Sequence, residues 1–234
     1  MGKPFKKELE SAYEILRWSN EIDISGFKSQ VTQNIESPLL IVGSGGSLSA
    51  CHYAARLAES NGRFSKALTP LELYSAQKVL RKSSVLFLSA SGRNNDIRFA
   101  FKLATESEPV GITSLTMRSN SPLSELSQKY TISDCFEYDI PTGKDGFLAT
   151  NSLIGFFTIL NRAFVGEKEL MIEKVDNSLL NEIDGFIGEI FKDYTLTVLS
   201  SGWSHSVALD IESKCTEAAL IATLPADYRN FGHG

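Results

Sequence analysis

The chain has 234 residues and a formal net charge of -5, with 42% hydrophobic and 22% charged residues. This composition is typical of a globular protein, and no apolar stretch approaches the roughly 20 residues needed to cross a bilayer. No basic field and no run of lysine and arginine interleaved with aromatic residues is present. Nucleic acid and membranes are therefore not expected as partners.

The cysteines and the N-terminus indicate the compartment. Cys51, Cys135 and Cys215 are far apart and in no C-x-x-C spacing, which predicts buried free thiols rather than a disulfide framework or a metal site. Basic residues near the N-terminus have no apolar segment behind them, so a cleaved secretion signal is not expected. The cytoplasm is the expected location.

Two amphipathic patterns open the chain and predict a helical lead-in over residues 1–35. The first places Leu9, Tyr13 and Leu16 near one helix face, and the second runs from about residue 25 to 34. From residue 38 onward, short apolar runs alternate with helical stretches, beginning with "PLLIVG", "ALT", "SSVLFLS", "PVGITSL" and "YTISDCFEYDI". This alternation predicts an α/β domain over residues 36–166, with a parallel sheet covered on both faces.

The last part of the chain repeats the plan of the first βα unit. Residues 167–193 are charged and amphipathic, as in a helical connector, and "TVLSSGWSHSVALDIESK" follows them. Aligning Val42 with Leu199 places Gly45 on Gly202 and Ser47 on Ser204. We therefore expect residues 194–234 to begin a second, incomplete domain of the same kind.

The loop "GSGGS" after the first apolar run is a candidate phosphate site. It lacks the lysine of a nucleotide-triphosphatase loop, and Leu48 stands where a dinucleotide fold needs its third glycine. A second apolar run, "SVLFLS", also leads into a serine-glycine loop before a helix. If these strands are neighbours, hydroxyls and the amides of two helix N-termini surround one phosphate monoester, without lysine, metal or cofactor. The alternative is that these residues only cap helices and form turns.

Four segments in this order resemble the SIS (sugar isomerase) family, especially the isomerase half of glucosamine-fructose-6-phosphate aminotransferase. They are "GGS" at 45–47, "SASG" at 89–92, "GFLATNS" at 146–152 and "ALDIESKCTEAAL…DYRNFGHG" at the end of the chain. The resemblance implies a flavodoxin-like three-layer sandwich with a five-stranded parallel sheet, usually two such domains per chain, and a homodimer. It also implies a phosphorylated sugar, such as a hexose or amino-hexose phosphate, as the ligand.

By position, the resemblance implies phosphate binding by Ser47, Ser89 and Ser91, with Gly46 and Asn94 in the same two loops. Asn94 stands where the aminotransferases keep a threonine. On the sugar side of the pocket the implied residues are Arg93, Lys144 and Thr150. Arg93 and Lys144 replace acidic residues of the aminotransferases, and for both the alternative is a solvated surface charge.

Two further residues carry the implied catalysis. Glu217 matches the family glutamate that moves a proton between sugar carbons, and His233 matches the histidine linked to ring opening. A carboxylate can act as this base if burial raises its pKa. The alternative for Glu217 is a surface ion-pair stripe with Asp210 and Lys214 at helical spacing. His233 is the penultimate residue, where a chain end is usually mobile.

Three functions remain open. The first is an enzyme, either an aldose-ketose isomerase or an amino-sugar phosphate deaminase or deglycase. The second is a non-catalytic domain that senses a sugar phosphate. The third, a sugar-phosphate lyase or etherase, needs an acid-base residue in the first domain, and none stands out there.

Overall fold

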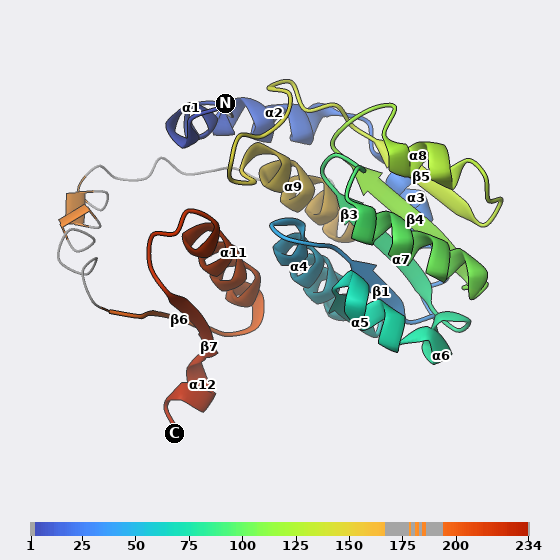
Figure 1. Ribbon diagram of the computed structural model, residues 1–234. Coiled ribbons are helices and arrows are strands. Elements are labelled where there is room, and N and C mark those ends of the chain that lie inside the picture. The colour runs from blue at the N-terminus through green and yellow to red at the C-terminus, as the bar shows by residue number, and fades with distance from the viewer. Residues whose placement is uncertain (1–2, 167–177, 179–180, 183, 186–193, 234) are drawn as a thin grey trace. The chain divides into compact units, whose positions relative to one another are not determined.

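The computed structural model describes residues 3–166, 178, 181–182, 184–185 and 194–233. The chain divides into two compact units, Met1–Leu170 and Met171–Gly234, and each is described by itself (Figure 1). The expected connector over residues 167–193 lies almost entirely outside the described residues. None of the helices that the structure describes is long and apolar enough to span a membrane.

The first unit is built on a five-stranded, fully parallel sheet with the strand order β2-β1-β3-β4-β5. The strands are β1 (Leu39–Val42), β2 (Ser65–Leu68), β3 (Ser84–Ser89), β4 (Gly111–Thr116) and β5 (Ser133–Glu137). β1, β3 and β5 lie within runs expected to be strands, β4 extends one residue beyond its run, and β2 overlaps the run "ALT" only at Ala67 and Leu68. This order is that of flavodoxin-like folds, and the predicted fold class is confirmed.

Helices cover both faces of the sheet because successive strand residues point to opposite sides. Leu39 and Ile41 of β1 pack into one core, whereas Leu40 and Val42 pack into the other. The first core contains α2 (Ala12–Glu21), α3 (Ser25–Thr32), α4 (Ser47–Ser60) and α9 (Asn151–Val165). The second contains α5 (Pro70–Ser75), α6 (Gln77–Leu80), α7 (Asn95–Glu106) and α8 (Pro122–Ser127).

The helices before β1 belong to this unit and are fixed to α9. The buried guanidinium of Arg162 donates to the carbonyl oxygens of Ser19 and Ile22, at 2.8 and 2.9 Å. These carbonyls lie at the C-terminal end of α2, where the helix dipole favours a positive charge.

The prediction that Leu9, Tyr13 and Leu16 share one apolar helix face is partly wrong. Leu9 and Tyr13 are each 51% exposed, whereas Leu16 is buried as expected. The pattern is interrupted at Ser11, which separates α1 (Phe5–Glu10) from α2, so a single 3.6-residue period does not run through both helices.

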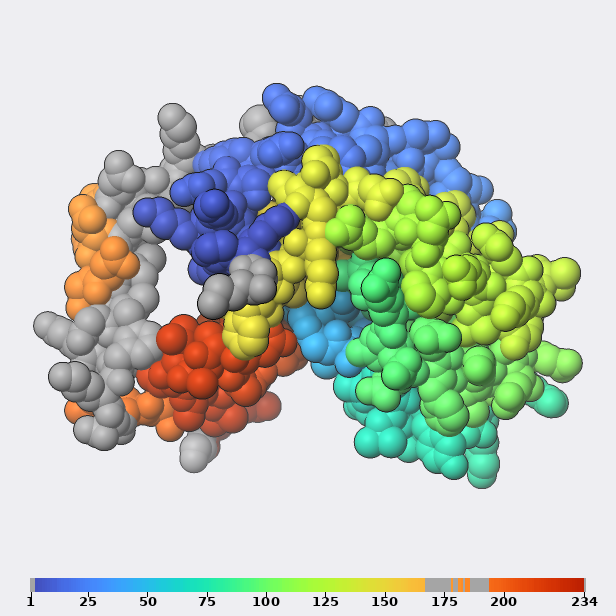
Figure 2. All heavy atoms as spheres, turned by 45° about the horizontal axis from the view of Figure 1, so that its top comes forward, coloured from blue at the N-terminus to red at the C-terminus, as the bar shows by residue number. Residues whose placement is uncertain are grey.

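The loop between β5 and α9 is held by two carboxylates. Asp145 accepts hydrogen bonds from the amides of Thr150, Asn151 and Ser152, at 3.1 to 3.2 Å for the shortest contact of each, and so caps the start of α9. Buried Glu8 of α1 accepts a hydrogen bond from the amide of Gly146. Figure 2 shows this loop, in yellow, lying against the blue N-terminal helices.

The second unit contains two parallel strands, β6 (Leu196–Ser200) and β7 (Thr223–Asp227). Between them lie a short 3-10 turn, Gly202–Ser204, and the helix α11 (His205–Glu217), and a last short helix, α12 (Tyr228–Phe231), follows β7. The aligned glycines of the expected repeat share one backbone conformation, with φ of 57° at Gly45 and 54° at Gly202. Both turns therefore have a glycine in the left-handed conformation, and in the second unit this glycine begins a 3-10 helix.

The three cysteines are free and differ in how deeply they are buried. Cys51 is buried in the core, as predicted, and burial raises the pKa of its thiol. Cys135 and Cys215 are only partly buried, so the prediction is too strong for these two. Burial, reinforced by the charge of Glu137, raises the pKa of the Cys135 thiol to about 12.

Replacing the capping carboxylate at α9 should destabilise the first unit. We expect Asp145→Ala to lower the free energy of unfolding by about 1 to 2 kcal/mol, because three helix-start amides lose their acceptor. Asp134→Ala, which removes an exposed carboxylate from β5, is the matched control. Urea denaturation of both variants measures the difference, and equal stabilities would contradict the capping role of Asp145.

Candidate functional site

Four loops meet at the carboxyl ends of the strands, where ligands bind in parallel α/β sheets. They connect β1 to α4 (43–46), β3 to α7 (90–94), β4 to α8 (117–121) and β5 to α9 (138–150). A Cβ atom at Gly46 would lie 2.7 Å from the Cβ of Ala149, and one at Gly92 would lie 2.7 Å from the Cβ of Ser121. Glycine at both positions therefore lets neighbouring loops come into contact.

The two serine loops expected to be neighbours follow strands that are paired directly. β1 and β3 lie side by side in parallel, with Val42 opposite Phe87. Ser89 ends β3 and is buried, and Ser91 lies two residues further on in the loop. The sheet thus brings the start of α4 and the loop after β3 to the same edge, as the sequence predicts.

Ser47 is the first residue of α4 and is partly buried. The residue before it, Gly46, offers no side chain to cap the helix, and Gly45 adopts the left-handed conformation with φ of 57°. The hydroxyl of Ser49 donates back to the carbonyl oxygen of Gly46, at 2.8 Å. Glycine at the N-cap provides no side-chain acceptor at the start of this 14-residue helix, although the amide of Leu48 already donates to the carbonyl oxygen of Gly45 at 2.9 Å.

The amides at the start of α7 are expected from the sequence to bind the same anion as those of α4, and they do not have this arrangement. The side-chain oxygen of Asn94 accepts hydrogen bonds from the amides of Asp96 and Ile97, at 2.8 and 3.1 Å. The helix caps itself, so these amides are already used and the expectation is wrong for α7. Asparagine is among the residues that form this cap best.

A cavity of about 430 Å³ lies between the loops after β3, β4 and β5. Three of the predicted site residues, Ser91, Arg93 and Lys144, line it together. Its other lining residues come from the ends of β4 and β5: Arg118, Ser119, Asn120, Ser121 and Asp139. Sequence reasoning missed this second group, because it considered only loops with serine and glycine. The polar segment "RSNS" directly after a predicted strand was the available signal.

Asp139 and Ser119 join two of these loops. The carboxylate of Asp139 accepts hydrogen bonds from the hydroxyl of Ser119 and from its amide, the latter at 2.9 Å. These donors, with a smaller contribution from the charge of Arg118, lower the pKa of Asp139 below its ordinary value. The carboxylate is therefore ionised at neutral pH and fixes the loop after β4 against the end of β5.

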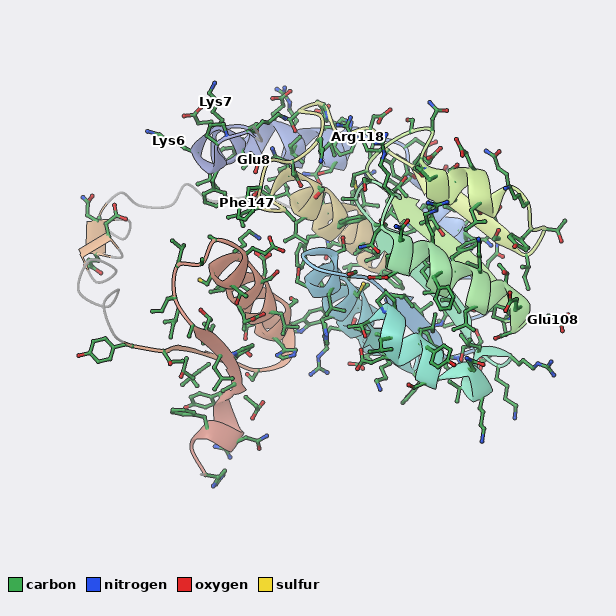
Figure 3. All side chains as sticks on the ribbon, viewed as in Figure 1. Lys6, Lys7, Glu8, Glu108, Arg118 and Phe147 are labelled. Atoms are coloured by element: carbon green, nitrogen blue, oxygen red, sulfur yellow. The ribbon has the colours of Figure 1, made fainter. Side chains whose placement is uncertain are left out.

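Arg118 reaches from the loop after β4 towards the loop after β5. One of its terminal nitrogens lies 3.5 Å from the position that a Cβ atom would take at Gly143. Figure 3 labels this half-buried side chain beyond the end of β4. Lys144 follows Gly143 directly, so two basic residues from different loops border the same cavity.

The structure places Thr150 outside the set of residues that line this cavity. Its side chain is buried, and its hydroxyl donates to the carbonyl oxygen of Leu148 at 3.3 Å. Its amide donates to Asp145 at 3.2 Å. Thr150 is therefore part of the capping arrangement at the start of α9.

Glu217 and His233 lie in the second unit. Glu217 is exposed and is the last residue of α11, where the helix dipole does not favour a negative charge. Lys214 forms an ion pair with Asp210, so part of the alternative ion-pair stripe is present. His233 is exposed, and its amide donates to the carbonyl oxygen of Asn230 at 3.1 Å.

A larger cavity of about 680 Å³ lies beside the edge strand β2, next to α5 and α6. No predicted site residue lines it, and its lining includes Pro38, Phe64 and Ser83, which directly precede β1, β2 and β3. Among the described residues, no group of three or more His, Cys, Asp or Glu side chains could hold a metal ion. The cavity of about 430 Å³, which lies at the carboxyl ends of strands and is lined by three of the predicted site residues, is therefore the candidate site.

Comparison of the sequence with models of protein families finds no match, and comparison with curated proteins finds none either. Solved structures of similar fold do exist. The C-terminal domain of glucosamine-fructose-6-phosphate aminotransferase from Francisella tularensis has a TM-score of 0.75 and 16% identity. The matched part covers 98% of this chain and 71% of that one.

A second similar structure is tagatose-6-phosphate ketose/aldose isomerase from Escherichia coli, with a TM-score of 0.76 and 17% identity. Here the matched part covers 98% of this chain and 68% of that one. Both structural matches extend over nearly the whole chain, and their TM-scores establish the fold. The chain has the fold of the sugar isomerase (SIS) proteins, as its sequence motifs predict.

Proposed function

We propose that this protein binds a phosphorylated sugar at the carboxyl ends of β1, β3, β4 and β5. The observation that carries the proposal is the shared cavity, where Ser91 from a predicted phosphate loop lies with Arg93 and Lys144. Proteins of the same fold include an aminotransferase and an isomerase of phosphorylated sugars. A hexose phosphate or an amino-hexose phosphate is the proposed ligand.

In this proposal the phosphate group lies between the two serine loops. The hydroxyls of Ser47, Ser89 and Ser91 donate to its oxygens, as do the amides at the start of α4 beside Gly46. Asn94 stands in the same loop, and its side-chain oxygen is already bonded to α7, which leaves its amide group as the donor. Thr150 acts through the α9 cap, which positions the loop that carries Lys144.

The proposed reaction is an aldose-ketose isomerisation, or the related deamination or deglycation of an amino-sugar phosphate. Glu217 is the proposed base that takes the proton from one sugar carbon and returns it to the next, and His233 is the proposed residue for ring opening. These steps move only protons and need no cofactor. Glu217 is exposed at the end of α11, so this role requires that the bound ligand or a partner removes the carboxylate from water.

Self-association is part of the proposal. The second unit exposes several large apolar side chains, among them Trp203, Leu220, Leu224 and Tyr228. Apolar surface of this kind is commonly covered by a partner, and a homodimer is the simplest arrangement that covers it.

Ser91→Ala should weaken binding of fructose 6-phosphate about 10-fold to 150-fold, because a charged acceptor loses a hydroxyl donor. Ser29→Ala, an exposed serine on α3, should bind as the unchanged protein does. Isothermal titration with fructose 6-phosphate, glucosamine 6-phosphate and free fructose measures these affinities. Equal affinity of Ser91→Ala and Ser29→Ala would remove Ser91 from the site, and no binding by the unchanged protein would refute the proposal.

Glu217→Gln should abolish isomerisation and leave ligand affinity nearly unchanged, because the amide keeps the size of the side chain and cannot accept the proton. Glu212→Gln, on the same helix, is the matched control. NMR spectra of fructose 6-phosphate incubated with each protein measure conversion. A Glu217→Gln variant with full rate would reject the base assignment. Binding without conversion by the unchanged protein would instead favour the sensor function.

A further inference from the structure

The candidate cavity has more positive charge than its own carboxylate can balance. Arg93, Arg118 and Lys144 line it, and Asp139 is the acidic residue among its lining side chains. The three basic residues come from three different loops, so the fold brings them together and sequence proximity does not. Like charges around one cavity repel each other, and an anion placed between them relieves that repulsion.

The carboxylate of Asp139 already accepts hydrogen bonds from Ser119. Its carboxylate is bonded to the amide and hydroxyl of Ser119, which hold it within the loop after β4. Among the residues that the structure describes, no carboxylate forms an ion pair with Arg93, Arg118 or Lys144. The charge of Arg118 is partly balanced by the nearby Asp139, whose pKa it lowers, and the lining as a whole keeps an excess of positive charge for a ligand.

The proposed phosphate position does not use these three charges. It lies between the serine loops, at the start of α4 and the end of β3, and neither Ser47 nor Ser89 lines the cavity. Ser91 belongs to both places, because it lies in the serine loop two residues after the end of β3 and also lines the cavity. A sugar whose phosphate reaches Ser91 can thus extend its other end towards Arg118 and Lys144.

We propose that the natural ligand is a phosphorylated sugar that also carries a carboxylate, either a sugar acid or a sugar joined to an organic acid. This inference rests on the proposed function and adds the substrate class. A guanidinium binds a carboxylate through two parallel hydrogen bonds, which fits the half-buried Arg118. Lys144 and Arg93, which are more exposed, add charge from the adjoining loops.

Two matched ligands test the proposal by isothermal titration: gluconate 6-phosphate and glucitol 6-phosphate. They share the phosphate, the chain length and the hydroxyls, and differ in the carboxylate at carbon 1. We expect gluconate 6-phosphate to bind at least about tenfold more tightly, because charge-assisted hydrogen bonds form to its carboxylate. The preference should weaken as the salt concentration rises.

Arg118→Gln and Lys144→Gln identify the residues responsible. Each should reduce the affinity for gluconate 6-phosphate much more than that for glucitol 6-phosphate, so that the ratio of the two affinities approaches one. Arg81→Gln, which removes a charge from the end of α6, is the control and should keep the preference. Thermal unfolding of each variant checks the fold, and exposed Lys144 provides the test if Arg118→Gln is unstable.

The outcomes separate this inference from the proposed function. If both ligands bind equally well, the carboxylate inference is overturned and phosphosugar binding stands. If neither ligand nor fructose 6-phosphate binds, the proposed function itself fails. If Arg118→Gln weakens both ligands by the same factor, the basic residues bind the phosphate and the inference is again overturned.

Discussion

The parallel pairing of β1 with β3 is the constraint on which the rest of the first unit depends. The chain places β2 on one side of β1 and β3 on the other, so the loops after β1 and β3 leave the sheet in diverging directions. A space for a ligand therefore arises at their carboxyl ends from topology alone. Every later loop returns to the same edge, because all five strands run in the same direction.

In this unit apolar packing stabilises the sheet and its covering helices, whereas polar contacts fix the loops at the carboxyl edge. The two cores on the faces of the sheet stabilise the strands and their covering helices. At the carboxyl edge, by contrast, the loops are fixed by hydrogen bonds of Asp145 and Asp139 and by the close approach of Gly46 and Gly92 to neighbouring loops. A site built on such contacts can change its residues while the cores stay intact.

The sequence was sufficient for the sheet and only partly sufficient for the site. The apolar signal is strongest in the central strands β1, β3 and β4, which are buried along almost their whole length, and weaker in the edge strands β2 and β5, which expose Lys66 and Asp134. The capping of α7 by Asn94 is a local contact that the sequence could have revealed, because asparagine before a helix is a cap signal. The position of Arg118 beside Gly143 could not be predicted from the sequence, because it depends on how two loops pack against each other at the carboxyl edge of the sheet.

The contact between Glu8 and Gly146 joins residues 138 positions apart in the chain. The loop that carries Lys144 therefore gains this hydrogen bond only when the first helix has packed against it. By thermodynamic linkage, a ligand that orders this loop also strengthens the attachment of α1, and loosening α1 weakens the ligand. The N-terminal helix, none of whose residues lines the cavity, is thus energetically coupled to the ligand that the cavity binds.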